Sequence, residues 1–208
     1  MGKDIYNLAL TLTKGIGPVY SAKLMNELES AEEFFTLPDK EIAERLSGMP
    51  KKLRNLDKKK ALKIAKKELE WAEKNEVRVI TFDDKAYPRR LHHIPDRPLS
   101  LFVKGEGEID PIRTIGIVGT RNATNYGKMW IEKLMRDLMP YGVQVISGLA
   151  YGIDIAAHQA ALKNGMSTIG ILGHGLSKIY PADHRRTARD MLQHGAVITE
   201  FSHDEDPD

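Results

Sequence analysis

Three glycine-containing turns, each between a short apolar run and a helical pattern, constrain the fold of this chain most strongly. The apolar runs cover residues 115–118, 143–146, 168–172 and 196–199, and helical patterns at 126–139, 153–163 and 183–194 lie between them. Such short, β-branched apolar runs are typical of parallel strands buried on both faces. Strands that alternate with helices predict βαβ units with right-handed crossovers. We therefore expect an α/β fold, a mostly parallel sheet with helices on both faces.

The position of the turns predicts where a ligand binds. In open parallel sheets the ligand site lies beyond the carboxyl ends of the strands. The turns that follow the first three runs begin at Gly119, Ser147 and Gly173. We expect the functional site at these three turns.

Residues 1–70 are predicted to form a small all-α domain, and residues 71–208 the α/β domain. Helical patterns flank the turn Gly15-Ile16-Gly17-Pro18. This arrangement resembles the helix-hairpin-helix motif of DNA-binding proteins, whose turn amides and following helix N-terminus face a phosphate. The alternative is a tight helix–helix turn that needs glycine only for its backbone conformation.

A lysine-rich segment at residues 51–67 precedes strands predicted at 77–82 and 99–103. Leu62, Ala65 and Leu69 form an apolar stripe, so the lysines occupy the exposed face of a helix. That face is either a solvated surface or a non-specific phosphate-binding surface. The acidic segment 204–208 is predicted to have no fixed structure.

Composition excludes several classes of protein. The chain has no cysteine, which excludes disulfides, thiolate metal sites and a thiol nucleophile and suits a reducing cytoplasm. No signal peptide and no membrane-spanning apolar run is apparent. The net charge of +2 neither requires nor excludes a nucleic acid. We expect a cytoplasmic protein with no membrane partner.

The first turn does not match known phosphate-binding patterns for nucleotide cofactors. A dinucleotide site requires G-x-G-x-x-G, whereas the turn reads Gly119-Thr120-Arg121-Asn122-Ala123-Thr124. Arg121 stands where backbone should approach a pyrophosphate, and the P-loop pattern is also absent. We expect no cofactor.

A metal site is a weaker interpretation than a structural one. Asp154 and His158 lie four residues apart in a predicted helix and share one face. Metal binding requires a larger cluster, for which the further candidates are His174, Asp183, His184 and Glu200. We expect Asp154 and His158 to brace the second turn, the histidine bonding the aspartate or a neighbouring loop. We expect neither a metal nor a catalytic residue.

The turns do offer hydrogen-bond donors and cations for an anionic polymer. Backbone N–H groups at a helix N-terminus form an anion-binding nest, and neighbouring strands place such nests roughly 5 to 10 Å apart. This interval suits successive phosphates of extended nucleic acid. The predicted binding residues are Gly119, Thr120, Arg121, Asn122, Ser147, Gly148, Tyr151, Gly173, His174, Gly175, Lys178 and Arg185.

Several spaced motifs resemble those of the DNA processing protein DprA (Smf) family. Val118-Gly119-Thr120-Arg121 is similar to the family's V-G-S/T-R, and Ser147 to Leu162 is similar to S-G-x-A-R-G-I-D-x-x-A-H-x-x-A-L. Gly173-His174-Gly175-Leu176 with Tyr180-Pro181 is similar to G-x-G-L-D-x-x-Y-P. Tyr87-Pro88, the segment 94–105 and Thr199-Glu200-Phe201 extend the resemblance over most of the chain.

The resemblance implies a Rossmann-like domain preceded by a small helical domain. It implies a non-enzymatic protein that binds single-stranded DNA without sequence preference and loads the recombinase RecA in recombination and natural transformation. It also implies a homodimer in the full-length protein. Arg121 matches the arginine of the family's binding pocket, so we expect it to be the main phosphate cation, with Lys178 and Arg185 closing the pocket.

The sequence departs from the family pattern in four places. Tyr151 replaces an arginine, Ser177 replaces an aspartate, and Ala182 stands where a lysine often follows Tyr-Pro. Arg185 and Arg186 can replace that lysine, and Tyr151 can stack on a base. The family's second basic motif does not follow Phe201, so we hypothesise that this chain is part of a longer protein, with one sheet edge open and the dimer surface missing.

The rival interpretation is an enzyme or sensor for a small nucleotide. A related fold carries phosphoribohydrolases whose signature is P-G-G-x-G-T-x-x-E. The nearest segment here, Gly173-His174-Gly175-Leu176, lacks the following glutamate. A third possibility, a protein-interaction module, has no sequence feature that identifies its partner.

Overall fold

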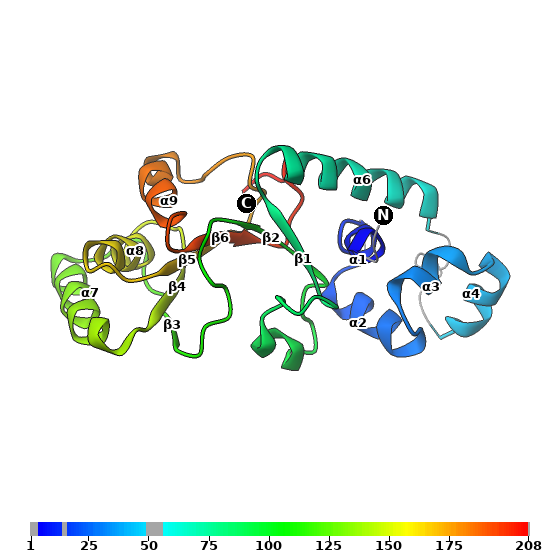
Figure 1. The fold of residues 1–208 in the computed structure, drawn as a ribbon, viewed down its shortest axis with the longest axis horizontal. Coiled ribbons are helices and arrows are strands. Elements are labelled where there is room, and N and C mark those ends of the chain that lie inside the picture. The colour runs from blue at the N-terminus through cyan, green and yellow to red at the C-terminus, as the bar shows by residue number, and fades with distance from the viewer. Residues whose placement is uncertain (1–3, 14–15, 49–55, 208) are drawn as a thin grey trace. The chain divides into compact units, whose positions relative to one another are not determined.

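The computed structural model describes residues 4–13, 16–48 and 56–207 of the chain. The chain packs as two compact units, residues 1–101 and 102–208 (Figure 1). The sequence prediction put the domain boundary at residues 70/71. In the structure the long helix after residue 57 and the strand after it both pack against the first helix, so they belong to the first unit.

The first unit is mainly helical. Its elements are α1 (Asp4–Thr11), α2 (Pro18–Glu27), α3 (Ala31–Thr36), α4 (Asp39–Arg45), α6 (Lys58–Lys74), β1 (Arg78–Thr81) and the 3-10 helix η1 (Arg89–His93). Leu24, Phe34 and Ile42 are completely buried in its core. Side-chain caps start two of its helices, because Ser30 accepts from the Glu33 amide and Asp57 accepts from the Lys60 amide.

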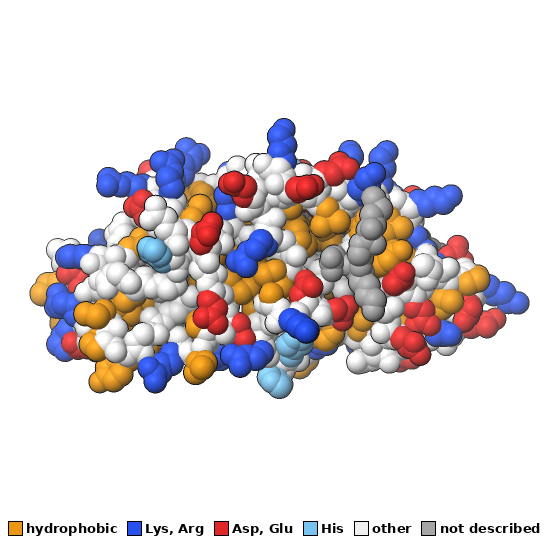
Figure 2. Space-filling view, in the orientation of Figure 1, with side chains coloured by type: hydrophobic (Ala, Val, Ile, Leu, Met, Phe, Trp, Pro, Cys, Tyr) orange, Lys and Arg blue, Asp and Glu red, His pale blue; other side chains and the backbone are white. Residues whose placement is uncertain are grey.

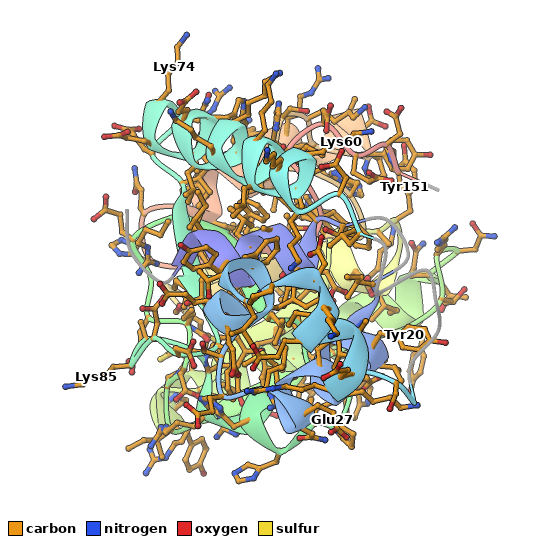
Figure 3. All side chains as sticks on the ribbon, turned by 90° about the vertical axis from the view of Figure 1, so that its right-hand side faces the viewer. Tyr20, Glu27, Lys60, Lys74, Lys85 and Tyr151 are labelled. Atoms are coloured by element: carbon orange, nitrogen blue, oxygen red, sulfur yellow. The ribbon has the colours of Figure 1, made fainter. Side chains whose placement is uncertain are left out.

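Helix α6 carries the described part of the lysine-rich segment. Ala61, Ala65 and Ala72 are buried along one side, while Lys60 and Lys74 are exposed. Figure 3 shows Lys74 pointing away from the unit. The predicted amphipathic helix is therefore confirmed for α6, and residues 51–55 lie outside the described residues.

The second unit contains the predicted α/β fold. Its elements are the end of β2 (Ser100–Lys104), β3 (Thr114–Gly116), α7 (Asn125–Leu138), η2 (Met139–Tyr141), β4 (Gln144–Gly148), α8 (Ile153–Lys163), β5 (Thr168–Ile171), η3 (Ala182–His184), α9 (Arg185–Met191) and β6 (Ala196–Thr199). Strands β3, β4, β5 and β6 are parallel, and β2 runs antiparallel beside β6. The described sheet has the order β1-β2-β6-β5-β4-β3.

The three crossover helices of this unit follow one another along the sheet. Because the order β3-β4-β5-β6 follows the chain, right-handed crossovers place α7, α8 and α9 on the same face. Helix α8 packs against both α7 and α9. On the other face, the Gln144 amide donates to the Glu108 carbonyl. The three helices that connect the parallel strands of the described part of this unit therefore share one layer.

The burial of the predicted strands is uneven. Strand β6 is buried throughout, as the sequence predicts. Strand β3 lies at an edge of the sheet, and Val118, predicted as the end of a buried strand, is 85% exposed. The prediction was wrong there because an edge strand has a neighbour on one side only. Hydrophobic side chains lie on the surface around α7 in Figure 2.

No helix within the described residues is long and apolar enough to cross a membrane.

Candidate functional site

A cavity of about 340 Å³ opens where β3, β4 and β5 end. Each strand contributes the residues that follow it, as expected for an open parallel sheet. The lining residues are Arg121, Gly148, Leu149, Ala150, Tyr151, Ile171, Leu172, Gly173, His174, Tyr180, Pro181 and Pro207. We call this space the strand-end cavity. It brings Arg121 together with Gly148, Tyr151, Gly173 and His174, which the sequence predicted as one site.

The first two turns are locked together through backbone. The Ile153 amide donates to the Thr120 carbonyl at 3.1 Å, and a side chain at Gly152 would overlap that same carbonyl. Gly152 also has φ +85°, a conformation that favours glycine. Gly119 leaves room for the Ile153 side chain, because a Cβ atom added at position 119 would lie only 2.6 Å from the Cβ of Ile153. The position of Arg121 is therefore fixed by the start of α8.

Arg121 is the exposed cation of the strand-end cavity. Its guanidinium has no hydrogen bond or ion pair with another described residue, so its donors are available to a ligand. The Thr120 hydroxyl, by contrast, accepts from the Asn122 amide at 3.1 Å and holds the turn in shape. The Asn122 amide, which the sequence predicted as an anion-binding donor, therefore donates within its own turn instead of into the cavity.

Ser147 holds β4 against β3. Its hydroxyl donates to the Ile117 carbonyl at 2.6 Å, and the side chain is 3% exposed. A hydroxyl has a single proton to donate. The structure therefore directs this proton between strands rather than into the cavity.

His158 links β4 and β5 beneath the second turn. Its Nε2 lies 2.6 Å from the Gly148 carbonyl oxygen and its Nδ1 lies 2.7 Å from the Thr168 hydroxyl. A carbonyl only accepts, so Nε2 carries the proton. Burial lowers the pKa of His158 to about 4, which keeps the ring neutral at pH 7. The sequence left open whether the histidine bonds Asp154 or a neighbouring loop. In the structure it bonds the last residue of β4 and the first residue of β5, while Asp154 packs against the Cα of Gly148.

Two exposed tyrosines line the strand-end cavity. The Tyr151 hydroxyl donates to Asp183 at 3.0 Å, and its ring meets His184 edge-on at 4.9 Å between centroids. The Asp183 carboxylate raises the pKa of Tyr151 because it accepts that proton. Tyr180 is 55% exposed. Tyr180 is not among the residues that the sequence motifs singled out for binding, although an aromatic residue in the loop after a glycine turn was a usable signal.

His174 presents an unused acceptor. Its Nδ1 lies 2.8 Å from the Gly175 carbonyl oxygen, which only accepts, so Nδ1 donates in this contact. Its Nε2 is buried and has no hydrogen-bond partner in the structure, and the side chain is only 4% exposed. A buried polar atom without a partner is costly. A ligand N–H or O–H group in the cavity would satisfy it.

Two backbone amides at and just after the third turn donate to the acidic segment 203–207. The Gly175 amide donates to the Glu205 carbonyl at 3.0 Å, and the Ser177 amide donates to the His203 carbonyl at 2.9 Å. Lys178 forms an ion pair with Asp206. The predicted absence of fixed structure was therefore wrong for residues 204–207, because glycine at 175 and the neighbouring amides give the segment backbone partners.

Lys178 and Arg185 line a second cavity, which we call the α9 groove. It has a volume of about 380 Å³, and its other cations are Lys104 and Arg189. Its apolar lining residues are Leu176, Ile179, Ala188, Leu192 and Val197. Basic side chains gather over α9 at the upper left of Figure 2. The structure thus places these two predicted residues beside the strand-end cavity's third turn, and not among its lining residues.

The N-terminal hairpin is only partly described. The Tyr20 and Ser21 amides donate to the Gly17 carbonyl, and Pro18 starts α2. Lys14 and Gly15 lie outside the described residues. The prediction that this turn contacts DNA therefore stays a prediction.

Residues 78–208 match the family model described as DNA recombination-mediator protein A. The chain is 31% identical over 206 residues to the protein Smf of Synechocystis, covering 96% of this chain and 51% of the relative. It is 38% identical over 125 residues to the DNA processing protein DprA of Bacillus subtilis, covering 60% of this chain and 42% of the relative.

Solved structures of similar proteins share the fold. The X-ray structure of DprA from Streptococcus pneumoniae aligns with a TM-score of 0.58 and 25% identity, covering 92% of this chain and 70% of that one. A Helicobacter pylori DprA structure, described by its single-stranded DNA binding mode, aligns with a TM-score of 0.55 and 29% identity, covering 63% and 59%.

The chain spans about half the length, or less, of the curated relatives named above. The family match covers the whole second unit, including all three glycine turns, and it bears out the resemblance that the sequence motifs carry. This chain, with its Rossmann-like sheet, belongs to the DNA recombination-mediator protein A (DprA/Smf) family.

Proposed function

We propose that the strand-end cavity binds single-stranded DNA and that the protein passes this DNA to the recombinase RecA. The observation that carries the proposal is the position of Arg121. It is an exposed cation without a partner among the described residues, at the mouth of a cavity whose walls include two exposed tyrosines. A cation beside aromatic rings is the combination by which proteins bind single strands without sequence preference.

Arg121 supplies the phosphate contact. A guanidinium can donate two parallel hydrogen bonds to a phosphate, and it has the fixed charge that such a contact requires. The turn that carries it is held by the Ile153–Thr120 hydrogen bond, so little conformational entropy is lost when DNA binds. The site is therefore preorganised for a phosphate beside the N-terminus of α8.

Tyr151 and Tyr180 supply surfaces for bases. Stacking of one base on an aromatic ring contributes about 1–3 kcal/mol and tolerates any base. The hydrogen bond to Asp183 and the contact with His184 hold the Tyr151 ring in place. His174 Nε2 accepts a hydrogen bond from an amino or imino group of a base that enters the cavity.

The relatives support both parts of the proposal. The solved Helicobacter pylori relative is described by its single-stranded DNA binding mode. The family is described as a recombination mediator, which supports transfer of the DNA to RecA. Neither activity requires a catalytic residue, and we propose a binding protein rather than an enzyme. In the full-length protein we propose a homodimer.

Fluorescence anisotropy with a labelled poly-dT oligonucleotide tests the DNA-binding part. Arg121→Ala should weaken binding about ten- to a hundredfold at low salt, because a hydrogen-bonded charge is worth about 1.5–3 kcal/mol. The plot of log affinity against log salt should become shallower by about 0.7, the value for one phosphate contact on a single strand.

Arg136→Ala is the matched control, because Arg136 is an exposed arginine in the last turn of α7, away from the cavity lining. It should leave the affinity unchanged within about twofold, the effect expected of one distant, screened charge. Equal losses in the two variants would contradict the proposed site. Competition by dTMP as strong as by the oligonucleotide would favour the small-nucleotide interpretation instead.

A further inference from the structure

The acidic segment 203–207 lies on groups that are suited to phosphate. It takes the backbone amides of Gly175 and Ser177, and it places Asp206 on Lys178. The atoms that it brings are two carbonyl oxygens and one carboxylate. Amides and a lysine are also the groups that hold nucleic acid phosphates. The oxygen atoms of the segment therefore accept from the same donors at the third turn that would bind the oxygen atoms of a phosphate.

The third turn is shaped to receive this segment. A side chain at position 175 would overlap the carbonyl oxygens of Ser202 and His203, so only glycine allows this approach. The backbone of Gly175 does not have a positive φ, and an alanine can adopt its conformation. Pro207 then reaches the wall of the strand-end cavity. The segment therefore borders the proposed DNA site directly.

The charged contact between the segment and the third turn is exposed to solvent. The Asp206 side chain is 83% exposed and Lys178 is 38% exposed, so water and salt screen their ion pair. Asp204 and Glu205 are exposed, and the backbone bonds of the segment can be exchanged for bonds from a ligand. A polyanion that offers phosphates to the same donors can therefore compete with the segment for them.

We propose that the acidic segment 203–207 is a built-in competitor of DNA, which covers the third turn and must leave before a strand runs from Arg121 to Lys178. This inference rests on the proposed function and specifies how the same site is regulated. Short strands that reach only Arg121 leave the segment in place and gain no contact with the third turn. Longer strands, which carry enough phosphates to displace it, gain Lys178 as a further contact.

The consequence is measurable in the salt dependence. While Asp206 neutralises Lys178, a phosphate that replaces Asp206 releases a counterion from DNA but leaves Asp206 to attract a cation, so the net release at that lysine is close to zero. Asp206→Asn frees Lys178, so binding should gain one phosphate contact and the salt slope should steepen by about 0.7. The affinity for an oligo-dT should rise about two- to fivefold at low salt, the range for one exposed ion pair.

A matched control separates this effect from a general loss of negative charge. Asp137→Asn removes one carboxylate and frees Lys133 from an exposed ion pair on α7. Like Asp206→Asn, it removes the carboxylate of an exposed lysine–aspartate ion pair, but at a place that lines neither cavity. We expect it to change the affinity by less than about 1.5-fold, because a distant exposed charge is screened by salt.

Gly175→Ala provides a test without any change of charge. The added methyl group displaces residues 202–203 from the third turn, and the affinity for the oligonucleotide should rise as it does in Asp206→Asn. Circular dichroism and a thermal melt of each variant establish that it is folded. An affinity equal to wild type in either Asp206→Asn or Gly175→Ala, or an equal rise in Asp137→Asn, overturns the inference.

Arg121→Ala, made in the wild-type and the Asp206→Asn background, distinguishes failure of the inference from failure of the proposed function. If Arg121→Ala weakens binding in both backgrounds and Asp206→Asn has no effect, the DNA site stands and its regulation by the segment does not. If Arg121→Ala has no effect in either background, the proposed function fails and the inference fails with it.

Discussion

At the residue scale, His158 determines how the second unit responds to pH. The ring is completely buried, and its proton on Nε2 is shared with the Gly148 carbonyl. Desolvation lowers its pKa to about 4 from an ordinary value of 6.5. The unfolded chain therefore binds a proton more readily than the folded chain between these two values.

Because the folded pKa is the lower one, the stability that His158 contributes is complete above about pH 6.5 and is lost as the pH falls towards 4. The loss should approach about 3 kcal/mol, from 1.36 kcal/mol per pKa unit. Thermal unfolding of wild type and His158→Gln from pH 7 to pH 4 measures it. The variant should be less stable at pH 7 and less dependent on pH.

His194→Gln serves as the control for that experiment, since His194 is exposed near the end of α9. Its unfolding profile should follow wild type over the whole pH range. A His158→Gln profile that is as steep as wild type between pH 6.5 and 4 would show that another group causes the acid sensitivity.

The sequence predicts several of the residues that line the strand-end cavity, but not the hydrogen-bond partners of the predicted residues. Arg121, Tyr151 and His174 could be predicted because each follows an apolar run directly. The hydrogen bond from the Ser147 hydroxyl to the Ile117 carbonyl could not be predicted. The two residues lie 30 positions apart in the chain, and no local sequence pattern indicates a partner on a neighbouring strand.

At the element scale, the start of α8 positions the first turn. Gly152 has a positive φ, and its Cα lies against the Thr120 carbonyl, while Ile153 donates to that carbonyl. Helix α8 and the turn that carries Arg121 therefore move together. A change at Gly152 should affect both stability and DNA binding.

Gly152→Ala should lower the free energy of unfolding by about 2–4 kcal/mol, because it adds a backbone overlap to the cost of a positive φ. Gly165→Ala is the control, since Gly165 has φ +66° but open space around its Cα. It should cost about 1–2 kcal/mol, the penalty of the left-handed conformation alone. Urea unfolding of both variants measures the difference. Equal losses would mean that the contact with Thr120 contributes nothing.

Most element boundaries follow from periodicity. The predicted helix 153–163 and strand 196–199 agree with α8 and β6 at both ends. The predicted helix 183–194 was too long, because residues 182–184 form a 3-10 turn and α9 ends at Met191. Short 3-10 turns share the apolar spacing of an α-helix, so composition does not distinguish them.

At the scale of the whole molecule, the second unit has an uncovered apolar surface at its β3 edge. Val118, Tyr126, Met129 and Trp130 are each more than half exposed there. Edge strands beside exposed apolar side chains favour association with other chains.

We expect this chain to associate reversibly as its concentration rises, and Met129→Gln to reduce that association. Sedimentation velocity over a series of concentrations measures it. Ile64→Gln is the control, because Ile64 is a partly exposed residue of α6 in the other unit. Association that is unchanged in Met129→Gln would place the contact elsewhere.

Photochemical cross-linking tests the location of the DNA site most directly. An oligo-dT with 5-iododeoxyuridine at single positions is irradiated with the protein, and the modified residues are identified by mass spectrometry. We predict cross-links at Tyr151 or Tyr180, the aromatic walls of the strand-end cavity, and their loss in Arg121→Ala. Cross-links confined to residues 58–74 of α6 would contradict this account and assign DNA binding to the lysine-rich helix.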